Sequence, residues 1–260
     1  MNYLEEYYSH YDEEGRLLSK HGQVEYLTTM KYIQEYLGGD KTKRILEIGA
    51  GTGRYSVTLA KEGYRVDALE LTEHNLKLLK EKLSGEERIT TVQGNALDLS
   101  RYADNTFDLT LMLGPMYHLY NEEDKLQALK EAVRVTKQGG ILMVAYCMND
   151  STVVKYVFMQ GHLTQCLDKN KLTVDFHCIS EPEDLFEVVR IEEIFRLTKE
   201  LPVIREKIIA TDGATNYMRE IINNMDDETF AYWLKYHFCT CERMDLIGAT
   251  SHSLDILRKE

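Results

Sequence analysis

Short apolar runs and longer amphipathic stretches alternate along most of this chain. The runs lack a polar face, as in strands covered on both sides, and the stretches between them repeat apolar residues at helical spacing. Strands are expected at residues 44–48, 64–71, 88–98 (with a turn), 106–113, 141–146, 203–210 and 253–258. Strands that alternate with helices in this way predict an α/β fold built on a doubly wound sheet.

Residues 1–43 come before the first strand and do not follow the alternation of strands and helices. Tyrosines and acidic residues crowd the start, and from His21 onward apolar residues recur at helical spacing. Gly38 and Gly39 should end this helix. We expect the segment to be an N-terminal helical cap on the sheet.

Residues 149–190 also do not follow this alternation. A helix is expected around 151–167, followed by strand-like runs at 173–179 and 185–190. We interpret the segment as an insertion, or lid, between the fifth and sixth strands. No repeat, low-complexity tract or linker is visible, so residues 1–260 are predicted to form a single domain.

Helix boundaries elsewhere follow from capping residues. Thr72 and Asn121 are expected to cap the helices that follow them, and Gly139 with Gly140 should stop the second of these helices. Two further helical stretches are predicted at residues 191–201 and 214–241.

Composition narrows the class of protein. The chain has 260 residues, 43% of them hydrophobic, and a formal net charge of −12. This acidic balance argues against nucleic-acid partners and anionic membranes, because both need clustered lysine and arginine. No apolar run approaches the roughly 18 residues of a membrane span, and the first residues lack a signal-peptide core. Five cysteines, an odd number, suit a reducing compartment, so we predict a cytoplasmic location without membrane association.

A glycine turn follows the first strand. Gly49, Gly51 and Gly53 let the backbone take positive φ and let a ligand approach it closely. The free N–H groups of the next helix face this turn, as at many nucleotide sites. A dinucleotide fingerprint would need glycine where Arg54 stands, and the Gly-Lys-Ser/Thr of a phosphate loop is missing. A nicotinamide-dependent oxidoreductase is therefore disfavoured.

The pattern Glu47-x-Gly-x-Gly-x-Gly closely resembles the first motif of class I S-adenosylmethionine (SAM)-dependent methyltransferases. The resemblance implies a seven-stranded, mostly parallel, Rossmann-like sheet with an antiparallel last strand. It also implies SAM as cofactor and S-adenosylhomocysteine (SAH) as product. Glu47 can then offset the sulfonium and ammonium charges of SAM, whereas it would repel a pyrophosphate.

Further motifs follow in the order of that family. Glu70 ends the second strand 17 residues past Gly53, where the family carries an acid that accepts from the ribose hydroxyls. Asn95 replaces the usual aspartate after the third strand, and its carbonyl can still accept from the adenine amino group. Asp98 is the alternative acceptor, although we expect it to cap a turn. The resemblance implies a set of cofactor-binding residues: Glu47, Gly49, Ala50, Gly51, Gly53, Glu70, Leu71, Asn95, Ala96 and Leu113.

The loop Leu113-Gly114-Pro115-x-Tyr117-His118-Leu119 should face the methyl group, because ligands bind beyond the carboxyl ends of parallel strands. It resembles the loop of a bacterial group of these methyltransferases. Gly114 stands where enzymes that methylate amide or nucleobase nitrogens carry Asn or Asp. His118 is the candidate general base, and Tyr117 is a candidate for positioning the acceptor or contacting the methyl group. The alternative for His118 is a histidine hydrogen-bonded to the backbone.

Tyrosines of the N-terminal segment suit a lid, which the resemblance also implies. Tyr7, Tyr8 or Tyr11 could place a ring beside the sulfonium and a hydroxyl beside an acceptor. Arg16 could meet the cofactor carboxylate, the alternative being a solvated arginine.

The remaining histidines and cysteines carry less specific signals. His252 and His237 are further base candidates. Residues 237–241 match no common zinc spacing, and Cys239 and Cys241 should lie on different sides of a helix, so no metal site is predicted.

The sequence therefore predicts a SAM-dependent methyltransferase that acts on an unidentified small-molecule acceptor. Two alternatives stay open: a methyltransferase for protein or nucleic acid, and a SAM-binding protein without transferase activity.

Overall fold

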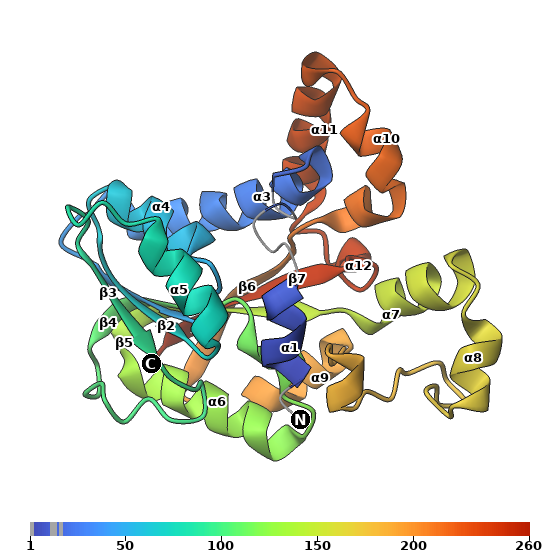
Figure 1. Ribbon diagram of the computed structural model, residues 1–260, viewed down its shortest axis with the longest axis horizontal. Helices are drawn as coiled ribbons and strands as arrows, with labels where there is room; N and C mark the ends of the chain where they lie inside the picture. The colour runs from blue at the N-terminus through green and yellow to red at the C-terminus, as the bar shows by residue number, and fades with distance from the viewer. Residues whose placement is uncertain (1–2, 11–14, 16–17) are drawn as a thin grey trace.

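The computed structural model describes residues 3–10, 15 and 18–260, and its centre is a seven-stranded sheet flanked by helices (Figure 1). The strands are β1 (Arg44–Ile48), β2 (Arg65–Glu70), β3 (Ile89–Gln93), β4 (Phe107–Met112), β5 (Thr136–Cys147), β6 (Val203–Ala210) and β7 (His252–Lys259). The α-helices are α1 (Tyr3–His10), α3 (Lys20–Leu37), α4 (Arg54–Lys61), α5 (Glu73–Glu81), α6 (Glu122–Val135), α7 (Asn149–Thr152), α8 (Leu163–Asp168), α9 (Ile191–Thr198), α10 (Arg219–Asn223), α11 (Asp227–Thr240) and α12 (Met244–Ile247). The 3₁₀ segments η1 (Pro115–His118), η3 (Pro182–Asp184) and η4 (Gly213–Met218) and the π-helix η2 (Val153–Met159) are shorter.

The strand order across the sheet is β3-β2-β1-β4-β5-β7-β6. β1 pairs in parallel with β2 on one side and with β4 on the other, and β7 runs antiparallel to both β5 and β6. The predicted fold class, including the antiparallel last strand, is therefore confirmed. Because the strand order reverses between β1 and β4, the loops that follow these strands diverge and leave a crevice at their carboxyl ends.

Alternate residues of β1 are buried on opposite faces of the sheet. Leu46 and Ile48 pack in one cluster with Leu129 of α6, whereas Ile45 packs in another with Leu59 of α4. A strand buried on both faces cannot slip in register without exposing apolar side chains. The strand ends that carry the site are thus held at fixed positions.

Two predicted helix boundaries are confirmed and one is wrong. Gly38 ends α3 in the left-handed region with φ of 60°, and the Asn121 side chain accepts from the backbone of Asp124 at the start of α6. The pair Gly139 and Gly140 does not stop α6. That helix already ends at Val135, and both glycines lie within β5, which pairs with β4 across a register shift.

The insertion differs from its prediction. Residues 173–179 and 185–190 form no strands; they make only the isolated bridges Leu172 with Cys178 and Met148 with Val189. Their backbone groups find other partners, since the Asn149 side chain bonds both Cys178 and Phe176. The expected helix at 151–167 is broken near Gly161, which has φ of 77°.

The C-terminal helical stretches are also shorter than expected. Helix α9 ends at Thr198, and residues 214–241 divide into η4, α10 and α11. Helices α10 and α11 extend away from the sheet beside α3 (Figure 1). Within the described part of the chain, no helix is long and apolar enough to cross a membrane.

Candidate active site

A cavity of about 510 Å³ opens at the carboxyl ends of the central strands. Most predicted site residues that the structure describes line it; Gly53 and the weaker candidates Asp98 and His237 do not. Tyr11 and Arg16, which were expected to contact the cofactor, lie outside the described residues. The predicted residues on the cavity wall are Glu47, Gly49, Ala50, Gly51, Glu70, Leu71, Asn95, Ala96, Leu113, Tyr117 and His118.

The three glycines after β1 all have positive φ, at 73°, 55° and 84°, but they do different things. A Cβ on Gly49 would lie 2.8 Å from the ring of Pro115, so this glycine lets the loop after β4 pack closely. A Cβ on Gly51 would meet no atom within 4 Å, so cavity space begins there. A Cβ on Gly53 would lie 2.7 Å from Leu79, so this glycine lets α4 and α5 pack together.

Glu47 is buried beneath the glycine turn. Its Oε2 accepts a 2.9 Å hydrogen bond from the backbone of Ser56 and a second bond from the Ser56 hydroxyl. Burial raises the pKa of Glu47 to about 8, and the nearby charge of Glu70 acts in the same direction. The carboxyl is therefore largely protonated at neutral pH unless a cation binds beside it.

Glu70 ties the glycine turn to the end of β2. Its Oε2 accepts from the backbone of Gly51 at 2.7 Å, and its Oε1 accepts from the backbone and hydroxyl of Thr72 at 2.9 and 2.8 Å. Thr72 occupies the predicted N-cap position of α5, but its hydroxyl donates to Glu70 and makes no capping bond to the helix backbone. An ionised carboxylate has further lone pairs with which to accept from a ligand.

Asn95 and Asp98 shape the turn after β3. The Asn95 Oδ1 accepts from the backbone of Leu97 at 3.0 Å, and the Asp98 side chain accepts from the backbone of Ser100 at 2.9 Å. Asp98 thus caps a turn, as expected. Asn95 lines the cavity and keeps one oxygen lone pair for a ligand.

His118 lies where the loop after β4 meets the N-terminal helix. Its Nδ1 is 2.7 Å from the carbonyl oxygen of Leu185, and a carbonyl only accepts, so Nδ1 carries the proton. Its Nε2 therefore accepts from the Tyr8 hydroxyl, 2.9 Å away. Burial lowers the pKa of His118 to about 4, which keeps the ring neutral at physiological pH. The hydroxyl of Tyr117 donates to the carbonyl of Leu113 and holds the loop.

Helix α1 and the insertion meet over this loop. Tyr7 and Tyr8 line the cavity, as does Phe186 of the insertion. The rings of Tyr7 and Phe186 lie edge to face with centroids 5.9 Å apart, and Tyr3 donates to Glu183 at 3.1 Å. Helix α1 therefore contacts the insertion beside the cavity, and the lid roles of Tyr7 and Tyr8 stay predictions.

Sequence reasoning gave little weight to the opposite side of the cavity, which Glu25, Cys147, Arg219 and His252 line. Cys147 and His252 face each other across the β5–β7 pairing. His252 was only one of several base candidates, because nothing in the sequence shows that the start of the last strand lies beside the end of the fifth. His237 packs against Gly213 and is not among the residues that line this cavity.

Cys239 and Cys241 were expected on different sides of a helix. Cys239 is exposed and Cys241 is buried, so the two thiols face different surroundings. Among the described residues, the group whose side chains come close enough to share a metal ion is instead Glu25, Asp212 and His252.

The pKa of His118 can be measured directly. We expect the ring to titrate near pH 4 in an NMR titration, with the signal assigned by its loss in His118→Gln. Because this pKa lies below the unfolded value near 6.5, the contribution of the neutral ring to stability is complete above pH 6.5 and is lost as the pH falls towards about 4. A midpoint near 6.5 in the folded protein would contradict the buried arrangement.

Comparison with known families identifies the domain around the cavity. Residues 46–144 match the family model described as a methyltransferase domain, and this range spans β1 to β5 with the loops that line the cavity. Residues 46–144 are thus similar to a methyltransferase domain. This match agrees with the predicted enzyme class.

Relatives and solved structures agree with this assignment. A demethylmenaquinone methyltransferase of Staphylococcus aureus is 33% identical over 134 residues, which are 50% of this chain and 52% of the relative. The chain thus spans about half the length of that relative.

Two crystal structures of other proteins show the fold. One is a SAM-dependent methyltransferase of Methanosarcina mazei, with a TM-score of 0.58, 16% identity and coverage of 88% of this chain and 96% of that chain. The other is a geranyl diphosphate C-methyltransferase of Streptomyces coelicolor in complex with Mg²⁺, geranyl diphosphate and SAH, with a TM-score of 0.57, 12% identity and coverage of 88% and 76%. The chain therefore shares its fold with both of these proteins.

Proposed function

We propose that this protein transfers the methyl group of SAM to a small-molecule acceptor. The observation that carries the proposal is one cavity in which the glycine turn, Glu70 and Asn95 lie beside Tyr117 and His118. The first group would hold the cofactor, and the second would face the acceptor.

Each cofactor contact follows from a group already described. Glu70 would accept from the ribose hydroxyls, Asn95 would accept from the adenine amino group, and Leu71 would flank the adenine ring. The open space at Gly51 would admit the amino-acid part of SAM close to the backbone, with Glu47 nearby to offset its positive charge.

The transfer is an in-line displacement. An electron pair of the acceptor forms the bond to the methyl carbon, and the pair of the broken C–S bond stays on sulfur to give SAH. An acceptor that carries a proton must lose it, and the Tyr8 hydroxyl hydrogen-bonded to the neutral His118 Nε2 offers a path. Tyr117 would shape the acceptor site through its bond to Leu113.

Several features favour a small acceptor. Tyr7 and Tyr8 of helix α1 and Phe186 of the insertion line the cavity, and the chain carries a net charge of −12. Gly114 replaces the Asn or Asp of enzymes acting on amide or nucleobase nitrogens. The Staphylococcus relative is named for demethylmenaquinone, a small molecule. We further propose that the loop 113–119 places the chain in the bacterial group described above, and that residues 1–260 act as one domain.

Calorimetric titration with SAM, SAH and NADH tests the cofactor assignment. We expect saturable binding of the two adenosyl ligands and none of NADH, followed by SAH formation once a screen of small acceptors finds a substrate. Binding of NADH alone would overturn the proposal. Binding of SAM with no turnover by any acceptor would favour the rival, a SAM-binding protein.

The raised pKa of Glu47 predicts that the affinity for SAM relative to SAH depends on pH. The SAM sulfonium favours the ionised carboxylate, so SAM binding should release a proton below about pH 8. The affinity for SAM relative to SAH should therefore rise by up to about tenfold as the pH increases through about 8. In Glu47→Gln the ratio of the two affinities should not change with pH, and a flat ratio in the wild type would refute this role.

A further inference from the structure

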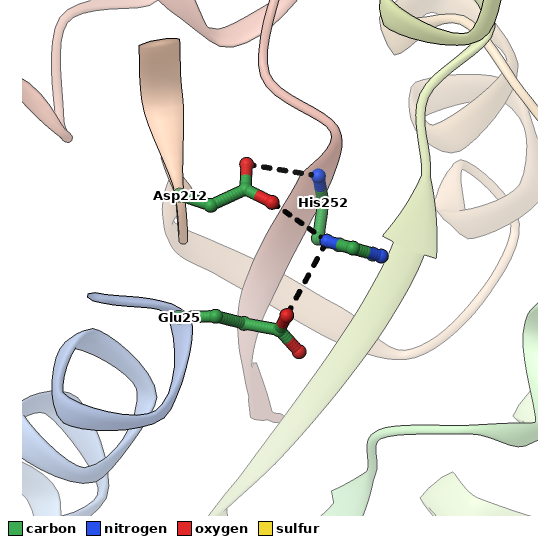
Figure 2. Close-up of side chains that lie close together, drawn as sticks. All are labelled: Glu25, Asp212 and His252. Atoms are coloured by element: carbon green, nitrogen blue, oxygen red, sulfur yellow. Dashed lines mark hydrogen bonds and ion pairs between the residues drawn. The ribbon is translucent and has the colours of Figure 1, made fainter. Parts of the chain in front are cut away.

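A charged cluster lies on the wall of the cavity away from the glycine turn. It combines Glu25 of α3, Asp212 after β6 and His252 at the start of β7, drawn in Figure 2. Asp212 Oδ2 lies 2.7 Å from His252 Nδ1, and Glu25 Oε2 lies 3.5 Å from the same nitrogen. Glu25 and His252 both line the cavity. Two carboxylates thus converge on one end of a single imidazole ring.

The buried Asp212 is held as a carboxylate. Its Oδ1 accepts from the Thr250 hydroxyl at 2.5 Å and from the backbone of Ser251 at 2.9 Å, and its Oδ2 accepts from Asn216 as well as from His252. Burial raises the pKa of Asp212, but His252 and these hydrogen bonds outweigh it and lower the pKa to about 2. Because the carboxylate is ionised, it accepts a hydrogen bond from the N–H at Nδ1 of His252.

The ring of His252 is held in its cationic form. Burial lowers its pKa, whereas the negative charges of Glu25 and Asp212, together with Cys147, raise it, and the net result lies well above the usual 6.5. An imidazolium donates from both nitrogens and cannot act as a base. This separates His252 from the neutral His118.

The free donor of His252 is the nitrogen opposite the carboxylates. Figure 2 shows this second ring nitrogen pointing away from Glu25 and Asp212, and it makes no hydrogen bond to any residue that the structure describes. Two further cations lie nearby: Arg219 lines the cavity, and Lys155 donates to Ser251 at 3.1 Å. An N–H donor of a cation on a cavity wall is suited to bind an oxyanion.

We propose that His252 binds an anionic oxygen of the methyl acceptor, with Asp212 and Glu25 as positioning residues. The inference rests on the proposed function and adds the chemical class of the acceptor: a molecule with an acidic hydroxyl, such as a phenol or enol, or with a carboxylate. A hydroxyl of this class releases its proton to solvent before the molecule binds. The resulting oxyanion, or the carbon conjugated to it, supplies the electron pair that forms the bond to the methyl group.

The hydrogen bonds favour this arrangement over a metal site built from the same three residues. A divalent ion would have to displace the proton of Nδ1 and to share Asp212 Oδ2 with the amide of Asn216. Asp212 already accepts from a hydroxyl, an amide and the backbone, as a carboxylate that orients a histidine does. Zn²⁺ binding is therefore measured as well.

The test uses two chromophoric anions, 4-nitrophenol and 4-nitrobenzoate, with the full-length protein saturated with SAH. We expect at least one probe to bind, and His252→Gln to weaken it by about tenfold, which corresponds to about 1.4 kcal/mol, with SAH affinity unchanged. His162→Gln is the matched control, because His162 stacks on Tyr156 and does not line the cavity. Glu25→Gln should lower the pH at which probe binding is lost, since removal of its charge lowers the pKa of His252.

The possible outcomes are distinct. Binding of either probe that depends on His252 supports the proposal. Binding of nitrophenol indicates an acceptor of the phenol or enol class, and binding of nitrobenzoate indicates a carboxylate. The proposal is overturned by the failure of both probes, by equal binding to His252→Gln, or by saturable Zn²⁺ binding that is lost in Glu25→Gln. If wild-type protein does not bind SAH, the proposed function fails and this inference fails with it, whereas SAH binding with no effect of His252 refutes the inference alone.

Discussion

Titration of the Gly51→Arg variant with SAH should show an affinity at least about 100-fold weaker than that of the wild type, a loss of about 2.7 kcal/mol. Gly51 has φ of 55°, and no atom lies within 4 Å of the position that a Cβ would take. The arginine side chain would therefore extend into the cavity without obstruction and fill the volume proposed for the cofactor. Its charge would also oppose the SAM sulfonium, so SAM binding should suffer at least as much.

The matched control is Gly38→Arg. Gly38 has φ of 60° and likewise has no atom within 4 Å of the place where a Cβ would lie, but it ends α3 away from the cavity. Both residues have a similar left-handed φ, so an arginine at either position meets a similar φ restriction, and only one of the two positions lines the cavity. Wild-type SAH affinity in a folded Gly51→Arg protein would mean that the cofactor does not lie against this turn.

Replacement of Glu70 by glutamine should weaken SAM and SAH binding by about 10- to 100-fold. The carboxylate accepts from Gly51 with one oxygen and from Thr72 twice with the other. A glutamine amide would place a donor against one of these donors, so the glycine turn would shift. The ribose hydroxyls would also lose an ionised acceptor, and hydrogen bonds to charged groups contribute about 1.5–3 kcal/mol each.

Glu73→Gln makes the same chemical change three residues later, on the exposed first turn of α5, and should bind SAH like the wild type. Calorimetry of the two variants separates loss of a local contact from loss of general negative charge. If Glu70→Gln and Glu73→Gln bound SAH equally well, the role of Glu70 at the ribose would have to be abandoned.

The part of the site around the glycine turn could be predicted because its signals are local. Positive φ at Gly49, Gly51 and Gly53 is a requirement on the backbone of those residues, and it is visible as glycine in the sequence. Glu70 follows a strand at a distance that allows one helix and a return strand. Even here, the sequence could not show that Gly53 serves the packing of α4 on α5, because Leu79 is distant in the chain.

The environment of His118 shows what a motif cannot supply. Its place after β4 was predictable, but its neutral tautomer and its pKa near 4 result from Leu185 in the insertion and from Tyr8 in the N-terminal helix. Neither segment belongs to the motif. The insertion was also where strand predictions failed, since short apolar runs without neighbouring strands bond to side chains instead.

By itself, the sequence determined the doubly wound sheet, the order of its strands and the glycine turn at one end of the cavity. These depend on apolar periodicity and on residues adjacent in the chain. Only the tertiary structure decided the end of the cavity that we propose for the acceptor. The cluster of Glu25, Asp212 and His252 comes from three elements far apart in sequence, and the antiparallel insertion of β7 beside β5 brings them to one wall. Charged side chains shift one another's pKa values through space, so the protonation states of these three residues depend on the fold that places them together.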